Sequence, residues 1–214
     1  MGRTRTAFIQ GICSPVEMKS RPRGFRRRKW ALVGAFLALC GCGATPRETF
    51  DLQGASVFEK THLSKLNQRA ALSVAEPTAD QLLNSNRLVV RQEAGNLAYL
   101  ADAQWADRAP RLVQARVISR LVRGGVDAAF PGGVVWYDLT TELRRFEIDA
   151  PRGVAVVEIA ARISSDQSGA LRGAAVFLGE AAVQHTQGPQ AANALDEALD
   201  RATAQLVVWT RKRI

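Results

Sequence analysis

The sequence predicts an α+β domain: a mixed, mainly antiparallel sheet with two packed amphipathic helices, preceded by a leader that is removed. Two observations carry this prediction. Strand-like segments, a helical pattern, further strand-like segments and a second helical pattern follow one another along the chain. The 214 − 41 = 173 residues that follow the leader fit one domain and are long enough to bury one core.

Short strand candidates open the domain, separated by turn-forming Pro, Gly and Asn residues. We expect them at residues 49–52, 71–75, 87–91 and 97–100. Asp107 is then placed to cap a helix that ends at Gly124 and Gly125. Its apolar side holds Val113, Val117, Ile118, Leu121 and Val122, and its polar side holds Arg116, Ser119, Arg120 and Arg123.

Three long strands are expected next, over 134–148, 154–163 and 171–183, as antiparallel neighbours. The second has the clearest alternation, with Glu158 and Arg162 pointing away from its apolar face. In the first, the alternation changes phase before Phe146, as a β-bulge would produce. A helix over 190–213 closes the chain, with Leu, Ala and Trp at helical spacing and Asp196, Glu197, Asp200 and Arg201 on the exposed side.

The start of the chain has the features of a cleaved lipoprotein signal peptide. A basic run precedes the apolar segment 30–39, which is about the length of a signal-peptide core and too short to span a bilayer. Leu39-Cys40-Gly41-Cys42 follows and resembles the lipobox of bacterial lipoproteins, with Cys42 as the lipidated residue. Met18 gives a compact basic start and is the expected initiation site. An ordinary signal peptide with two incidental cysteines is the alternative.

Dividing the chain at Cys42 changes how its charge is interpreted. Residues 1–41 hold nine basic residues and one acidic residue, so the leader carries +8 of the total +9 and the remainder is nearly neutral. A nucleic-acid partner is therefore not expected. We expect a signal peptide over 1–41, a lipidated tether over 42–48 and one domain over 49–214. Gly43 follows the anchor in place of an aspartate, which by resemblance favours the outer membrane.

No enzyme motif is apparent, and no catalytic residue, metal site or cofactor is expected. His62 and His185 lie in no recognisable catalytic setting. Glu147 and Asp149 share one face of a strand, but Arg144 and Arg145 beside them favour a solvated ionic surface. Five aromatic residues could line a lipid cavity, although core packing is favoured: Tyr99, Trp105, Trp136, Tyr137 and Trp209.

A run from Tyr99-Leu100 to Trp105-Ala106-Asp107 is the most specific element of a family resemblance. Together with Asn86–Arg91, Tyr137-Asp138-Leu139, Arg145–Asp149 and the closing helix, it resembles the auxiliary lipoproteins of ABC-type transport systems. The similarity covers almost all of the domain. The aromatic-rich first strand of many members is reduced here to Glu48–Leu52.

The resemblance implies a periplasm-facing lipoprotein that works beside an MCE-domain protein, a permease and an ATPase in moving lipids between two membranes. The missing nucleophile and metal constellations predict in addition that the domain binds or docks and does not catalyse. We expect Tyr99, Trp105 and Arg108 to mark the partner surface, because aromatic and arginine residues are enriched at such surfaces. A homo-oligomer is possible on this reading. The alternatives are a structural envelope lipoprotein, an assembly chaperone and a lipid hydrolase.

Overall fold

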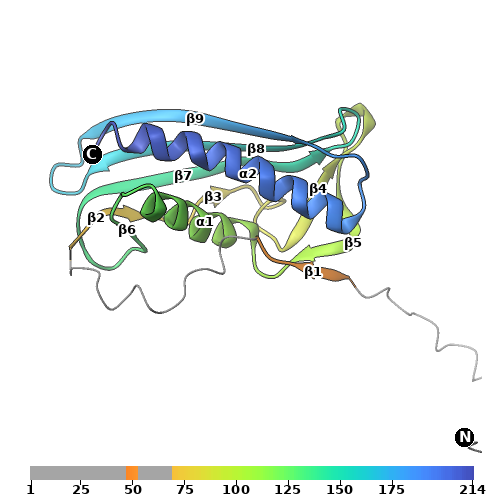
Figure 1. The fold of residues 1–214 in the computed structure, drawn as a ribbon, viewed down its shortest axis with the longest axis horizontal. Helices are drawn as coiled ribbons and strands as arrows, with labels where there is room; N and C mark the ends of the chain where they lie inside the picture. The colour runs from red at the N-terminus through yellow and green to blue at the C-terminus, as the bar shows by residue number, and fades with distance from the viewer. Residues whose placement is uncertain (1–46, 53–68) are drawn as a thin grey trace, which may run out of the picture. The chain divides into compact units, whose positions relative to one another are not determined.

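The computed structural model describes residues 47–52 and 69–214, and within them the chain forms one sheet and two long helices (Figure 1). The helices are α1 (Ala109–Arg123) and α2 (Gly188–Thr210), and a short 3₁₀ turn, η1, spans Glu93–Gly95. The described strands are β1 (Glu48–Phe50), β2 (Arg69–Val74), β3 (Thr78–Ala79), β4 (Arg87–Arg91), β5 (Leu97–Trp105), β6 (Ala128–Ala129), β7 (Val134–Asp149), β8 (Val154–Ser165) and β9 (Leu171–Ala182).

Strand β7 organises the sheet because both of its edges are paired. On one edge lies β8, antiparallel to it, and β9 continues antiparallel beyond β8. The other edge receives β2, β3 and β4 in succession, all three parallel to β7. Strand β5 then pairs with β4, β1 with β5, and β6 with β2. The sheet is therefore mixed, and its three longest described strands, β7, β8 and β9, pair antiparallel with one another.

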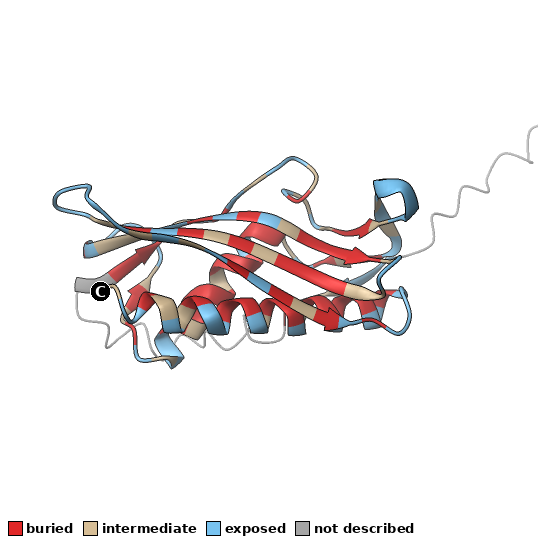
Figure 2. Cartoon of the chain, turned by 90° about the horizontal axis from the view of Figure 1, so that it is seen from above, coloured by how far each residue is buried: buried red, intermediate tan, exposed pale blue. Residues whose placement is uncertain are grey.

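Both helices cover the same face of the sheet (Figures 1 and 2). Buried side chains from this face and from the helices form one core that includes Leu139, Ile159, Leu195 and Leu199. Helix α2 lies directly against β9 at Gly179, where an added Cβ atom would overlap the carbonyl oxygen of Ala198. The other face of β7, β8 and β9 carries no helix in the described part of the chain.

The strongly periodic segments were predicted correctly, and so was the fold class. The two helices and the three long strands all occur within a few residues of the expected limits. The pairing of β7 with β8 shifts register between Leu143 and Arg145, which confirms the expected bulge. Strands β3 and β6 were not predicted, because two-residue strands leave no periodic pattern. The parallel pairing of β2, β3 and β4 with β7 was not predicted either.

The start of α1 corrects one expectation. Arg108 and not Asp107 occupies the N-cap, and no side chain caps the helix. Pro at the first turn sets the helical start one residue later than the sequence suggested. The Asp107 carboxylate accepts a hydrogen bond from the Arg108 N–H at 2.7 Å and pairs with Arg111 at 3.3 Å.

The polar side of α1 corrects a second expectation. Arg116 and Ser119 are buried, while Val122, assigned to the apolar side, is exposed. Arg116 donates hydrogen bonds to Asp196 and Asp200 of α2. Part of the polar stripe therefore faces the second helix and not water, because two carboxylates from α2 meet it there.

Candidate functional site

Tyr99 and Arg108 lie against the same turn, residues 80–86. The Tyr99 hydroxyl donates to the carbonyl oxygen of Leu82 at 3.2 Å. The Arg108 guanidinium donates to the Asn84 side-chain oxygen at 2.6 Å and to Glu76 Oε1 at 2.7 Å. The structure thus brings together two of the three residues expected at a partner surface, although they are nine positions apart and belong to different elements.

Strand β5 and the start of α1 explain this placement. Along β5, Tyr99 is 39% exposed, whereas Ala103 and Trp105 are buried. Strict alternation would place all three on one face, but the register shift in the β4–β5 pairing between Arg87 and Val89 interrupts it. The Arg87 guanidinium lies 5.1 Å from the centre of the Tyr99 ring and fixes its orientation by a cation–π contact. Arg108 is exposed at the N-cap of α1. The result is an exposed aromatic ring and an exposed arginine held by the 80–86 turn.

Trp105 has a different position from the other two residues. It is 1% exposed, and its ring lies 5.4 Å from that of Phe146 across the core. Its contribution is packing at the point where β5 ends, which agrees with the preference for core packing over a cavity lining. Any partner surface in this region consists of Tyr99, Arg108 and the 80–86 turn.

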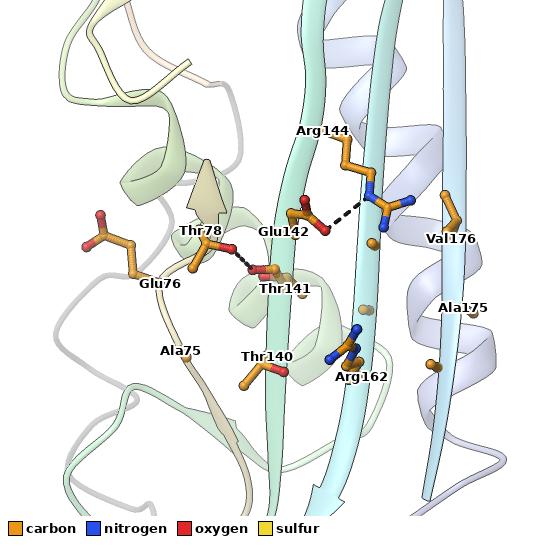
Figure 3. Close-up of a pocket in the computed structure, with 13 residues that line it drawn as sticks. Ala75, Glu76, Thr78, Thr140, Thr141, Glu142, Arg144, Arg162, Ala175 and Val176 are labelled. Atoms are coloured by element: carbon orange, nitrogen blue, oxygen red, sulfur yellow. Dashed lines mark hydrogen bonds and ion pairs between the residues drawn. The ribbon is translucent and has the colours of Figure 1, made fainter. Parts of the chain in front are cut away.

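A groove of about 490 Å³ lies on the helix-free face of the sheet (Figure 3). Its floor is formed by β7, β8 and β9, and its wall by the segment that joins β2 to β3. Small side chains dominate the floor. The lining residues are Ala75, Glu76, Thr78, Thr140, Thr141, Glu142, Arg144, Ala160, Ala161, Arg162, Ala174, Ala175 and Val176.

Three of the four charged residues of the groove have partners. Glu76 pairs with Arg108, so the groove adjoins the Tyr99 and Arg108 surface. Glu142 and Arg144 pair with each other at 3.1 Å, and Arg144 also approaches Glu158 at 3.8 Å. Within the described part of the chain, no hydrogen bond or ion pair involves the Arg162 guanidinium, which Figure 3 shows in the groove. The charged lining residues sum to zero formal charge, and Arg162 is the one among them without an ion-pair partner in the described part of the chain.

The groove was not predicted from the sequence, although the alternating pattern of β8 indicated which of its side chains face away from the core. The alternation of β8 correctly placed Glu158 and Arg162 on the face away from the core. The register that sets Arg162 between Thr140 and Ala174 depends on two neighbouring strands and is not visible in the sequence of β8. The wall from residues 75–78 depends on the parallel pairing of β3, which was not expected either.

Glu147 and Asp149 correct the expectation of a solvated ionic surface. Both carboxylates are buried, and Glu147 is only 3% exposed. Glu147 accepts hydrogen bonds from Arg91 at 2.9 and 3.1 Å and from Arg145 at 2.8 Å. The hydrogen bond to Glu147 raises the pKa of Arg91 above its ordinary value, against the opposing effect of burial. Of the two ionic partners of Glu147, Arg145 was expected and Arg91 was not. The burial of Glu147 was not expected either.

The five aromatic residues considered for a lipid cavity do not gather around one space. Trp105 is in the core, and Tyr99 and Trp136 are exposed on β5 and β7. Trp209 packs edge-on against Phe177 at 5.5 Å, near the end of α2. None of the five lines the groove on the helix-free face.

The described residues contain no group of three or more His, Cys, Asp or Glu side chains arranged to hold a metal ion. His185 is exposed in the loop before α2. No helix among the described residues is long and apolar enough to cross a membrane. Cys42 and His62 lie outside the described residues, as do the expected leader and all of the expected tether except Arg47 and Glu48.

Comparison with solved structures supports the fold. A protein of the DUF330 family from Xanthomonas campestris is 27% identical, with a TM-score of 0.59 over 66% of this chain and 84% of that one. An uncharacterized protein of known structure has a TM-score of 0.62 at 15% identity, over 77% of this chain and 99% of that one, and so supports the fold alone.

Comparison with known sequences identifies the family. An uncharacterized protein of Bradyrhizobium diazoefficiens is 32% identical over 147 residues, which is 66% of this chain and 39% of that protein. The chain therefore spans well under half the length of this relative. The family of ABC-type transport auxiliary lipoprotein components matches residues 50–207, nearly all of the described fold. The chain belongs to the family of ABC-type transport auxiliary lipoprotein components.

Proposed function

We propose that this protein is the periplasm-facing auxiliary component of an MCE-type ABC transport system that moves lipids between the inner and outer membranes. It acts by docking the MCE protein, is anchored through acylated Cys42 in the outer membrane, and performs no catalysis. The observation that carries the proposal is the family match over residues 50–207. The permease and the ATPase belong to the same system as its remaining parts.

The surface around Tyr99 and Arg108 supports a docking role. It combines an exposed aromatic ring with an exposed guanidinium, the two side-chain types most enriched at the centre of protein interfaces. Both side chains are held by hydrogen bonds to the 80–86 turn, so little rotamer freedom is lost when a partner binds. A preorganised surface of this kind suits a docking protein.

Co-purification of the MCE protein from envelope extracts tests the proposal. Wild-type chain should retain the MCE protein, and Arg108→Ala or Tyr99→Ala should retain roughly tenfold less, as expected when an interface anchor is truncated. Arg111→Ala is the matched control, since Arg111 lies three residues after Arg108 in α1 and its side chain is more exposed than that of Arg108. Tyr99→Phe separates the role of the ring from that of the hydrogen bond to Leu82.

Two results would overturn the proposal. If the wild-type chain never retains the MCE protein, even after cross-linking, the docking role is wrong. If the purified chain hydrolyses phospholipids or esters, and a single substitution abolishes this turnover, the protein is a lipid hydrolase and not a docking component.

A further inference from the structure

Arg162 is the residue of the groove whose positive charge is available to an anionic ligand. Its guanidinium has no partner among the described residues, whereas Glu76, Glu142 and Arg144 are already paired. A guanidinium binds phosphate and carboxylate oxygens with paired hydrogen bonds. Because Arg162 has no ion-pair partner among the described residues, its guanidinium is free to bind an anionic group.

The rest of the floor is suited to an apolar chain. Ala160 and Ala174 flank Arg162 on β8 and β9, and Val176 at the rim is 52% exposed. Leu178 continues this apolar row along β9. A volume of about 490 Å³ lies within the range of pockets that hold small ligands. An elongated molecule with a negative head and a hydrocarbon body matches this surface.

An extended peptide fits the floor less well. The main chain of β8 is paired with β7 on one side and β9 on the other, so it offers no free N–H or C=O groups to a peptide lying across it. At the outer edge of β9, Gln205 and Arg201 of α2 donate hydrogen bonds to the carbonyl oxygens of Leu178 and Glu180. These contacts obstruct the addition of another strand. A hydrocarbon chain has no hydrogen bonds to satisfy.

We propose that the groove binds an anionic phospholipid, with its phosphate on Arg162 and one acyl chain along Ala160, Ala174 and Val176. The inference rests on the proposed function, because it assigns to this chain direct contact with the lipid being moved. It differs from that function in one respect: the protein holds lipid itself and does more than dock a partner that holds it.

Photo-cross-linking in cells tests the site with the full chain in its membrane. Benzoylphenylalanine is placed at Val176 in the groove or at Glu197, an exposed control position on α2, in cells whose phospholipids carry ³²P. The acyl chains expected at Cys42 contain no phosphorus, so ³²P that appears on the protein only after irradiation reports a cross-linked phosphate-containing molecule, and mass spectrometry of the adduct identifies it as a phospholipid. We expect irradiation to give about tenfold more label at Val176 than at Glu197.

Substitutions of Arg162 then test its role. Arg162→Glu should lower the label at Val176 about tenfold, and Arg162→Lys should lower it less, because the positive charge remains while the paired hydrogen bonds of the guanidinium are lost. Lys212→Gln removes one positive charge from the end of α2 and should leave the label unchanged. Arg162 is exposed and has no partner among the described residues, so these changes leave the fold intact.

Three results would overturn the inference. Equal label at Val176 and Glu197 would show only that the whole domain lies near a membrane. Unchanged label in Arg162→Glu would show that Arg162 does not contact the headgroup. A protein with benzoylphenylalanine at Val176 that carries no ³²P after irradiation, or that is cross-linked to a polypeptide instead, would show that the groove does not hold a phospholipid. Retention of the MCE protein is a separate readout, so failure of the docking role is distinguishable from failure of this site.

Discussion

Gly179 shows how a single residue sets the distance between the sheet and α2. An added Cβ atom would overlap the carbonyl oxygen of Ala198 and lie 2.8 Å from the amide nitrogen of Ala202. Both are main-chain atoms of a helix and cannot rotate away. The absence of a side chain at this position therefore lets the helix lie directly on β9.

We expect Gly179→Ala to lower the free energy of unfolding by about 2–3 kcal/mol, because the helix must move away from the strand to admit the methyl group. Urea denaturation of the purified chain measures this change. Gly133→Ala is the control: no atom lies within 4 Å of an added Cβ there, and its effect should stay within about 0.5 kcal/mol. Equal denaturation midpoints for the two variants would contradict the close contact.

Glu147 is a second residue whose role depends on burial. Its carboxylate lies between Arg91 and Arg145, and its removal would leave two guanidinium groups without their shared partner. We expect Glu147→Gln to cost roughly 3 kcal/mol of stability. Glu142→Gln, on the same strand but with an exposed ion pair, should cost less than about 1 kcal/mol. A similar loss in both variants, measured by denaturation, would show that burial at Glu147 adds nothing.

At the scale of elements, α1 and α2 are joined by charge as well as by packing. Arg116, 2% exposed, bonds to Asp196 and Asp200, and Arg120 also bonds to Asp200. Desolvation raises the pKa of Asp196, although Arg116 and Arg120 act to lower it. Burial also lowers the pKa of Arg120, with a further contribution from Arg116. The charged side chains between α1 and α2 thus lose part of their hydration when the protein folds, which offsets part of the stabilisation from their ion pairs.

This balance predicts a pH dependence of stability. Because the pKa of Asp196 is raised in the folded protein, the folded form keeps its proton to a higher pH than the unfolded chain does. The contribution of Asp196 to the free energy of unfolding is therefore fully present below pH about 4, the ordinary pKa of an aspartate in the unfolded chain. This contribution is lost as the pH rises from there through the raised pKa of the folded protein. We expect the stability of wild type relative to Asp196→Asn to fall over this window in denaturation measurements at a series of pH values. A constant or rising difference would contradict the assignment.

The helix interface also shows which features were predictable from sequence. The apolar sides of α1 and α2 were predicted because helical periodicity is local to each segment. The burial of Arg116 was not, since it depends on aspartates 80 and 84 positions away. Tyr99 and Arg108 were selected by residue type, but only the fold shows that they meet at the 80–86 turn and that Trp105 does not join them.

At the scale of the whole molecule, the start of the described chain lies in the same part of the sheet as Tyr99. Strand β1 pairs with β5, the strand that carries Tyr99, and Asp102 of β5 accepts a hydrogen bond from the first residue of α2 at 3.3 Å. Residues 43–47 alone separate Cys42 from β1, and a segment of this length reaches roughly 20 Å at most. With the expected anchor at Cys42, the Tyr99 and Arg108 surface is held near the membrane, where tethering raises the effective concentration for a partner at the same membrane.

The length of the tether depends on which cysteine carries the lipid, and we expect it to be Cys42 and not Cys40. The residue before a lipidated cysteine is small in the lipobox: Gly41 precedes Cys42, whereas bulky Leu39 precedes Cys40. We expect Cys42→Ala to lose incorporation of an alkyne fatty acid and to accumulate as the uncleaved precursor, because the cysteine is both the acceptor and the cleavage signal. Cys40→Ala should keep the label and the mature mass, as judged by gel mobility and mass spectrometry. If the label survives in Cys42→Ala and disappears in Cys40→Ala, the anchor lies at Cys40 and the leader is two residues shorter than expected.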